Sequence, residues 1–325
     1  MKPTRRYLCA AMLAMPLAMV ALPSQAAAWP ERAITMVVPF PPGGPTDLVA
    51  RVMAAQLGEQ LGQTIVVENK GGASGTIGMI AAAKAPADGY TILYNTSSIA
   101  LSPNLYTKLP LNPSKDFAAV SSTAVIPLVL LTHPSVPANT VEEFIAYAKK
   151  KPGELAYGSA GAGNVTHLGG YLFNQSTGID AIHIPYRGSA PALVDLVGGQ
   201  FQFMTNTLND SLSFIRDKRV KALAVSSKNR SPMVPDVPTI NETVIPDFEM
   251  GAWQGIVVPA GTPAAIIEKL NQEIRTALKS EVILKQLALQ GAEPLGSTPQ
   301  EYDAYIRSET KRWGDVIKAA GVKLD

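Results

Sequence analysis

Apolar runs rich in β-branched residues alternate with segments of helical spacing along most of the chain. The run 33–40 is typical of a buried strand, and apolar residues then recur at helical spacing from Leu48 to Leu61. Further strands are expected at 64–69 and 90–96. Because parallel strands need a crossover that is usually a helix, this alternation predicts an α/β fold with mainly parallel sheets flanked by helices.

A second series of the same kind begins near residue 140. Its strands are expected at 154–158, 181–185, 200–205 and 220–226. Its helices are expected at about 164–177, 189–198 and 211–217. The carboxyl-terminal region is mostly helical, and Thr298, Pro299 and Glu301 have the pattern of a capping box at a helix start. The chain therefore contains two α/β halves and a helical end.

Two apolar segments, 120–133 and 248–261, separate the two series. If both are strands that link two lobes, lobe 1 comprises residues 29–125 plus 252–325, and lobe 2 comprises residues 126–251. A cleft between such lobes is a preferred place for a small ligand. The alternative is one continuous doubly wound domain with a helical tail, and the pattern alone leaves both open.

The first 28 residues differ from the rest of the chain. They hold three basic residues and no acid, an apolar stretch over 8–22 that is short for a membrane span, and small residues at 24–28. This pattern predicts a secretory signal peptide that is cleaved after Ala26 or Ala28, with a membrane anchor as the less favoured alternative. The mature protein is then expected in the periplasm.

Charge and cysteine content narrow the function. Removing the three basic residues of the leader from 28 leaves 25, against 26 acidic residues, and no basic cluster remains. A near-neutral chain of this kind argues against nucleic acid as a partner. The only cysteine, Cys9, lies in the leader, and the three histidines show no metal-binding spacing, so we expect no thiol chemistry, no metal and no cofactor.

Four segments share one design, in which a strand leads through a loop of small residues into a helix. They are 37–50, 66–78, 155–170 and 182–196. A helix start exposes backbone N–H groups without internal partners, and its dipole favours an anion there by roughly 0.3–1 kcal/mol. The loops are therefore suited to holding the carboxylates of a small molecule by backbone amides.

Two catalytic interpretations of these loops fail on detail. A phosphate-binding loop needs Lys followed by Ser or Thr after its last Gly, and Thr166 stands where a dinucleotide fingerprint requires Gly or Ala. The G-x-S-x-G motif of hydrolases is absent. An exported enzyme built from dispersed residues stays as a less favoured alternative.

Six ordered segments together resemble the substrate-binding proteins of tripartite tricarboxylate transporters, known as the Bug or TctC family. They are "VPFPPGGPTD" (38–47), "ENKGGASGTIG" (68–78), "GSAGAGNVTHL" (158–168), "IPYRGSAPALVDLVGGQ" (184–200), "KALAVSS" (221–227) and "VVPAGTP" (257–263). The resemblance covers the chain from Trp29 to its end. It implies a two-lobed periplasmic binding (Venus-flytrap) fold, a monomer that is not an enzyme, and delivery of a small carboxylate to membrane permease subunits.

The resemblance also implies which residues bind the ligand. The loop after the first strand and the "GSAGAG" loop are expected to face each other and hold one carboxylate, partly through ordered water. Lobe 1 would contribute Phe40, Gly43, Gly44, Thr46, Asp47, Ser74 and Gly75. Lobe 2 would contribute Ser159, Ala160, Gly161, Asn164, Thr166, Arg187, Gly188, Ser189 and Asn206. Asp47 is equally compatible with a helix N-cap, whereas for Arg187 a surface cation beside the loop is the slightly favoured alternative.

Two positions depart from many relatives. Asn164 replaces a serine, and Asn206 replaces an aspartate. Because a neutral Asn206 offers no countercharge to an ammonium group, we expect a plain mono- or dicarboxylate, aliphatic or aromatic, rather than an amino acid. A role as a ligand sensor that docks on a membrane kinase remains an alternative to transport.

Overall fold

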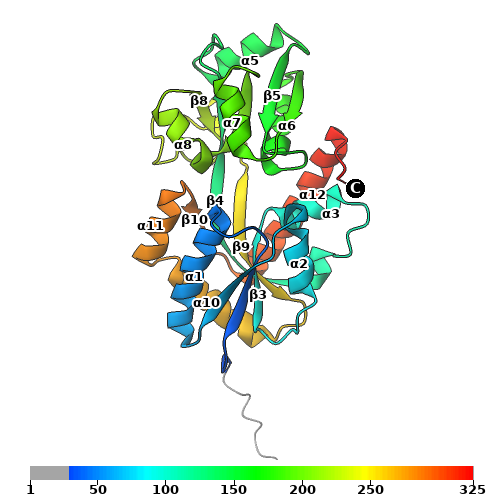
Figure 1. Cartoon of the computed structure of the whole chain (residues 1–325), viewed down its shortest axis with the longest axis vertical. Helices are drawn as coiled ribbons and strands as arrows, with labels where there is room; N and C mark the ends of the chain where they lie inside the picture. The colour runs from blue at the N-terminus through cyan, green and yellow to red at the C-terminus, as the bar shows by residue number, and fades with distance from the viewer. Residues whose placement is uncertain (1–28, 325) are drawn as a thin grey trace, which may run out of the picture.

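Two long strands run side by side through the middle of the molecule and connect two lobes (Figure 1). They are β4 (Phe117–Thr132) and β9 (Gly251–Pro259), which pair antiparallel from Phe117 to Pro127. The structure is a computed structural model that describes residues 29–324, so the predicted signal peptide lies outside the described residues. Both strands fall within the apolar crossings predicted from the sequence, apart from the first three residues of β4.

Lobe 1 is built on three parallel strands that continue the sheet from β9. The strands are β1 (Ile34–Val38), β2 (Ile65–Asn69) and β3 (Thr91–Thr96), in the order β2-β1-β3-β9. Its helices include α1 (Pro45–Leu61), α2 (Thr76–Ala83), α3 (Ser98–Leu105), α4 (Pro113–Asp116), α10 (Ala264–Ala277) and α11 (Glu281–Leu289), with the turn η1 (Ala73–Gly75) before α2.

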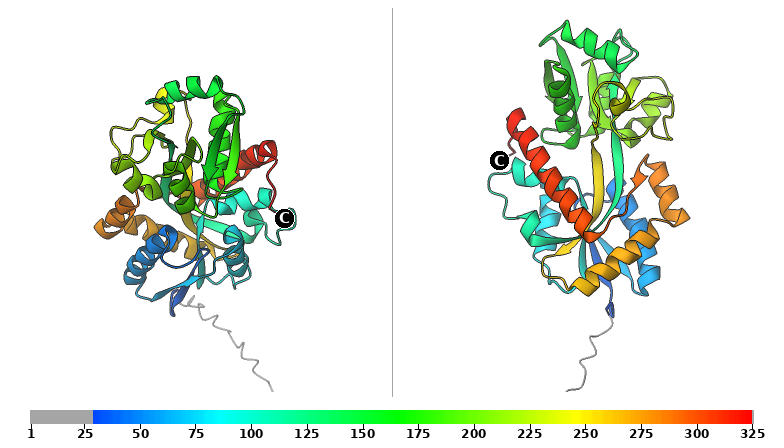
Figure 2. Two further views of the ribbon diagram at one scale, coloured as in Figure 1. Left: turned by 45° about the horizontal axis from the view of Figure 1, so that its top comes forward. Right: turned by 180° about the vertical axis from the view of Figure 1, so that it is seen from behind.

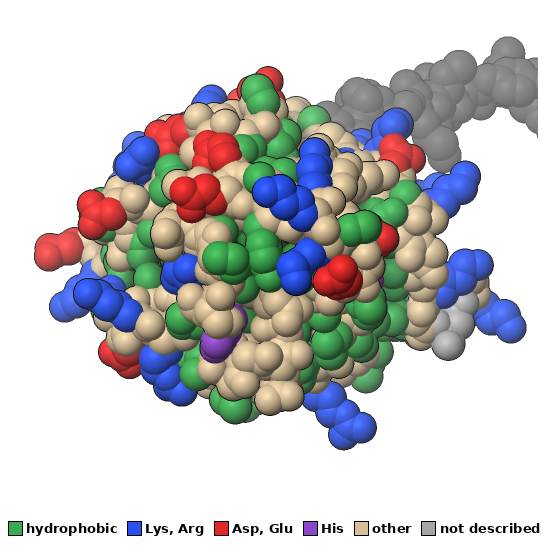
Figure 3. Space-filling model, turned by 90° about the horizontal axis from the view of Figure 1, so that it is seen from above, with side chains coloured by type: hydrophobic (Ala, Val, Ile, Leu, Met, Phe, Trp, Pro, Cys, Tyr) green, Lys and Arg blue, Asp and Glu red, His purple; other side chains and the backbone are tan. Residues whose placement is uncertain are grey.

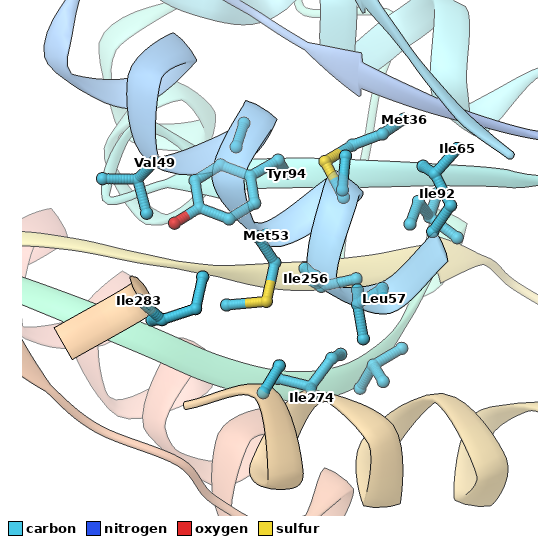
Figure 4. Packing of buried hydrophobic residues seen from close by; sticks show 14 of the residues in the cluster. Met36, Val49, Met53, Leu57, Ile65, Ile92, Tyr94, Ile256, Ile274 and Ile283 are labelled. Atoms are coloured by element: carbon cyan, nitrogen blue, oxygen red, sulfur yellow. The ribbon is translucent and has the colours of Figure 1, made fainter. Parts of the chain in front are cut away.

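One face of this sheet packs on α1, α10 and α11. Val49, Met53 and Leu57 recur every four residues on α1 and are fully buried against the strands (Figure 4). Because successive turns of a helix bring residues four apart to one face, this spacing produces the amphipathic helix that covers the sheet. The helical pattern predicted for this segment is confirmed.

Lobe 2 repeats the design on the other side of β4. Its parallel strands are β5 (Leu155–Ser159), β6 (Ala181–Pro185) and β7 (Phe203–Thr207), while β8 (Lys221–Val225) pairs antiparallel with β4. Its helices are α5 (Val141–Lys149), α6 (Val165–Thr177), α7 (Ser189–Val197), α8 (Leu208–Arg216) and α9 (Ile240–Thr243). The sheet is thus mixed, because β4 and β9 run antiparallel to their neighbours in both lobes.

One of the predicted helices begins earlier in the chain than expected. The helix expected at 211–217 begins three residues earlier, at Leu208, directly after β7 and without an intervening loop. The strand expected at 200–205 is likewise β7, which ends at Thr207. These shifts move the start of α8 to the carboxyl end of a strand, where parallel sheets bind ligands.

The last helix, α12 (Pro299–Ala320), extends along the back of the crossing strands toward lobe 2 (Figure 2). The predicted capping box forms at its start between Thr298 and Glu301. Trp313, Val316 and Ile317 near its end pack in one cluster with residues of lobe 2. The lobe boundaries at 125/126 and 251/252 stay a prediction. Helix α12 is a third structural link between the lobes, besides β4 and β9.

The outer face of lobe 2 mixes basic, acidic and apolar side chains (Figure 3). In residues 29–324, no helix combines the length and the apolar character that crossing a membrane requires.

Ser226 links the two crossing segments, 120–133 and 248–261, by hydrogen bonds. Its Oγ accepts a hydrogen bond from Leu128 N over 2.8 Å and donates one to Met250 O. The residue is 1 % exposed, so Ser226→Ala leaves a buried N–H of β4 without a partner. We expect a loss of about 1–3 kcal/mol in the free energy of unfolding, measured by urea titration. Ser308→Ala, at an exposed site on α12, is the control, and equal losses in both variants would contradict the assignment.

Candidate functional site

A cavity of about 260 Å³ lies between the lobes, with β4 and β9 as its floor. The floor residues are Ile126, Ala252, Trp253 and Gln254. Lobe 1 lines it with Phe40, Pro45, Thr46, Ser74, Thr96, Ser97, Ser98, Leu101, Ser102 and Leu105. Lobe 2 lines it with Ala160, Gly163, Asn164, Val165, Thr166, Ser189, Thr207, Asn209 and Asp210. The cavity is large enough for a small organic ligand.

Helix starts dominate the lining. Five helices, α1, α3, α6, α7 and α8, place residues of their first turns in the wall. Side-chain capping is absent at the starts of α1, α3, α7 and α8, whereas Asn164 caps α6. The wall therefore presents the positive ends of several helix dipoles and first-turn N–H groups that no N-cap side chain covers, although Ser98 N donates to Thr96 Oγ1.

The side chains of the lining are polar but almost uncharged. Ser and Thr hydroxyls come from both lobes, and Asp210 is the one charged residue in the lining of this cavity. No Lys, Arg or His is among the described residues that line it. An anion in this cavity would have to be held by backbone N–H groups, hydroxyls and side-chain amides.

Asp47 holds the first glycine loop, residues 39–44 between β1 and α1, in place. It is 1 % exposed and accepts hydrogen bonds from Gly43 N (2.8 Å), Arg51 Nε (2.9 Å) and Asn69 Nδ2 (2.8 Å). Burial alone would raise the pKa of Asp47, but the bonds from Arg51, Gly43 and Asn69 outweigh it and hold the pKa below its ordinary value. The N-cap alternative for Asp47 is wrong, because Gly44 occupies that position and α1 begins at Pro45.

The second glycine loop, residues 160–164 between β5 and α6, uses most of its backbone N–H groups in hydrogen bonds within the protein. Ala160 N donates to Thr166 Oγ1, Gly161 N to Ser159 Oγ, and Gly163 N to His167 Nδ1. Asn164 N donates to Gly161 O, and the Asn164 Oδ1 accepts from Thr166 N over 3.0 Å to cap α6. These N–H groups are therefore engaged within the protein, and the Asn164 Nδ2 is a donor that the cap leaves free for the cavity.

Two stacked histidines support this loop. The rings of His167 and His183 lie 3.7 Å apart at 13°, and His183 Nε2 forms a 2.7 Å hydrogen bond with Ser159 Oγ. Burial lowers the pKa of His167 to about 4. Burial together with the neighbouring His167 lowers the pKa of His183 to about 4 as well. Both rings are therefore neutral at pH 7 and act as structural hydrogen-bonding groups.

The structure brings some of the predicted site residues into the cavity wall and places others behind it. Phe40, Thr46, Ser74, Ala160, Asn164, Thr166 and Ser189 line the cavity. Gly43, Gly44, Asp47, Gly75, Ser159, Gly161, Arg187, Gly188 and Asn206 are outside the lining. Ser159 is fully buried against His183, and Arg187 is exposed at the surface. Most of the second group belongs to the loops that position the first.

Asn206 bears on the kind of ligand. Its side chain is fully buried behind α8, where Nδ2 donates to Ser211 Oγ, so it does not face the cavity. The expectation that its neutrality disfavours amino acids therefore no longer follows. The carboxylate nearest in the sequence that does line the cavity is Asp210.

Sequence reasoning missed two walls of the site. One is α3, whose Ser98 and Ser102 line the cavity, with Ser102 Oγ buried and unpartnered. The other is the first turn of α8, with Thr207, Asn209 and Asp210. Both follow directly on strands, β3 and β7, so the carboxyl ends of these strands were the signal that could have located them.

A two-lobed α/β fold with a polar cavity of helix starts between the lobes defines a periplasmic substrate-binding protein. The family described as "Tripartite tricarboxylate transporter family receptor" matches residues 49–322, and the chain belongs to this family. Its relatives are substrate-binding proteins, and this chain is accordingly a binding protein rather than an enzyme.

Individual relatives match over nearly the whole chain. Protein BugT of Bordetella pertussis is 40% identical over 307 residues, which is 94% of each chain. The structure of R. palustris Rpa4515 with adipate is 38% identical, with a TM-score of 0.77, covering 91% of this chain and 99% of that one. MatC from Rhodopseudomonas palustris with bound malate is 35% identical, with a TM-score of 0.72, covering 89% and 100%.

Proposed function

We propose that this protein captures a small mono- or dicarboxylate in the cavity between its lobes and delivers it to the permease subunits of a tripartite tricarboxylate transporter. The observation that carries the proposal is a cavity lined by uncapped helix starts and hydroxyls, without a basic side chain among the residues lining it. Such a wall attracts an anion through oriented N–H groups, and it suits a ligand that must be released as well as held.

The start of α1 is the best carboxylate site. Its N-cap is a glycine without a side-chain bond, and Thr46 follows in the wall of the cavity. Opposite it, Ser189 and the Asn164 Nδ2 come from lobe 2, whereas the Thr166 hydroxyl is engaged with Asn164 Oδ1 and Ala160 N. A carboxylate between them would bind both lobes and so favour the closed state.

The relatives support this ligand class. Rpa4515 and MatC have structures with adipate and malate, both of which are dicarboxylates. Membership of the transporter receptor family and the predicted signal peptide together support a monomeric periplasmic protein that docks on a membrane permease. The proposal extends this ligand class to the present chain without choosing one compound.

A thermal-shift experiment on the mature protein tests the proposal. Adipate, malate, succinate, citrate, benzoate and nicotinate are screened, with adipamide as the uncharged counterpart of adipate. A ligand at 100 times its dissociation constant adds about 2.7 kcal/mol, a rise in melting temperature of roughly 4 °C for a chain of this length. We expect at least one carboxylate to give this rise and adipamide to give none. No shift with any carboxylate, together with no acid in the supernatant of the denatured protein by mass spectrometry, would overturn the function.

A further inference from the structure

Three residues at the start of α8, Thr207, Asn209 and Asp210, line the cavity. Thr207 Oγ1 and Asn209 Oδ1 are buried without a hydrogen-bond partner, although both residues line the cavity. The carboxylate of Asp210 has no hydrogen bond or ion pair within residues 29–324.

Other helices of the chain show that this arrangement is not simply what the sequence dictates. Three helices begin with a threonine followed three residues later by glutamate, and in each the threonine Oγ1 accepts a bond from the glutamate N–H. They start at Thr140, Thr239 and Thr298. Thr207 and Asp210 have the same spacing, yet α8 has no side-chain cap. Because buried polar atoms are nearly always paired, this exception suggests partners that come from outside the chain.

The uncapped turn lies beside the proposed carboxylate site. Leu208 Cδ2 is 3.4 Å from the position that a Cβ on Gly291 would take. The neighbouring Gln290 donates from Nε2 to Pro45 O over 3.2 Å. The end of α11 thus contacts the starts of both α8 and α1, and both helix starts line the same cavity.

We propose that the ligand carries, besides its carboxylate, a hydrogen-bond donor that the first turn of α8 receives, either a hydroxyl or an ammonium group. This inference rests on the proposed function. A carboxylate such as Asp210 only accepts hydrogen bonds, and its charge repels a second ligand carboxylate at the same place. Thr207 and Asn209 beside it can donate as well as accept, so Asp210 is the group that a plain dicarboxylate leaves unpaired.

Matched ligands separate the possible donors. Calorimetric titrations compare propionate, lactate and alanine, then succinate, malate and aspartate, then glutarate, 2-hydroxyglutarate and glutamate. Within each set the members differ in bearing hydrogen, hydroxyl or ammonium at the second carbon. We expect at least one donor-bearing member to bind about tenfold or more tightly than its plain acid, because bonds to charged groups are the strong ones. Whether the hydroxy or the amino acid leads identifies the donor.

Asp210→Asn tests the residue itself. The variant should lose about tenfold or more in affinity for the preferred donor-bearing ligand while its affinity for the plain acid stays equal or rises. Glu281→Gln is the control, because Glu281 is also an acid in a first helical turn but is exposed on α11 outside the cavity. It should leave all affinities unchanged.

Two results would overturn the inference. Binding of plain acids as tightly as their hydroxy and amino counterparts would remove the donor requirement while leaving the proposed function intact. Equal losses for all members of a set in Asp210→Asn would show that Asp210 does not discriminate among them. If no member of any set binds, the carboxylate function itself fails together with this inference.

Discussion

Gly163→Val is expected to lower the affinity for the carboxylate ligand at least about 100-fold. Gly163 lines the cavity at φ +73°, a left-handed conformation that β-branched residues avoid. A Cβ on it would lie 2.8 Å from Leu105 Cδ2 and 3.1 Å from Leu324 Cδ1. Both leucines stand on the lobe 1 side, so the added methyl groups push the second glycine loop away from the wall that it must approach.

A matched glycine separates this effect from backbone strain alone. Gly153 has almost the same conformation, φ +72°, in the turn after α5 and far from the cavity lining. Gly153→Val should therefore carry the same backbone strain without the steric clash, and its affinity, measured by calorimetry, should stay that of the parent protein. Parent-like affinity in Gly163→Val, or an equal loss in Gly153→Val, would contradict the role assigned to this loop.

The strands of both lobes were predictable from the sequence because they are short β-rich runs with clear limits, whereas the division into two lobes was one of two alternatives that the pattern left open. The strands at 154–158 and 181–185 were placed within one residue, since each is a short apolar segment between polar or glycine-rich loops. In contrast, α3 was not predicted at all. It has eight residues and contains Pro103, so neither length nor periodicity marks it as a helix.

The site could be predicted only where a loop or a helix start has a recognisable local sequence pattern. Gly-rich segments located the starts of α1, α6 and α7, and Thr46, Asn164 and Ser189 do line the cavity. The use of each amide was not predictable, because it depends on partners far along the chain. Ser159 meets His183, 24 residues away, and thereby turns its hydroxyl from a ligand contact into a support of the loop.

The second expected result concerns pH. The protein should lose stability as the pH falls from about 6.5 toward 4, because His167 and His183 must stay neutral in the folded state. His167 Nδ1 accepts from Gly163 N over 3.1 Å, and a protonated ring cannot accept that bond. Burial lowers the pKa of both rings to about 4, and for His183 the adjacent ring adds to this effect, whereas an unfolded histidine titrates near about 6.5.

The sign follows from proton binding. Between pH 6.5 and 4 the unfolded chain binds protons that the folded pair does not, so the free energy of unfolding decreases as the pH falls. At pH 5 the loss for the two residues is about 2–4 kcal/mol relative to pH 7.5, and stability should be insensitive to this pair above pH 6.5. Urea titrations at pH 7.5, 6 and 5 measure the slope.

Histidine variants test whether His167 and His183 cause this loss of stability at low pH. In a His167→Gln, His183→Gln double variant the loss between pH 7.5 and 5 should shrink by about 2 kcal/mol or more, because the groups that gain protons on unfolding are gone. His133→Gln, outside the stacked pair, should keep the parent slope. Parallel curves for the parent and the double variant would mean that the stacked histidines do not couple protonation to folding. A smaller dependence of stability on pH together with weaker carboxylate binding would show that the neutral histidine pair also maintains the geometry of the second glycine loop. The two rings hold this loop through their hydrogen bonds to Ser159 and Gly163.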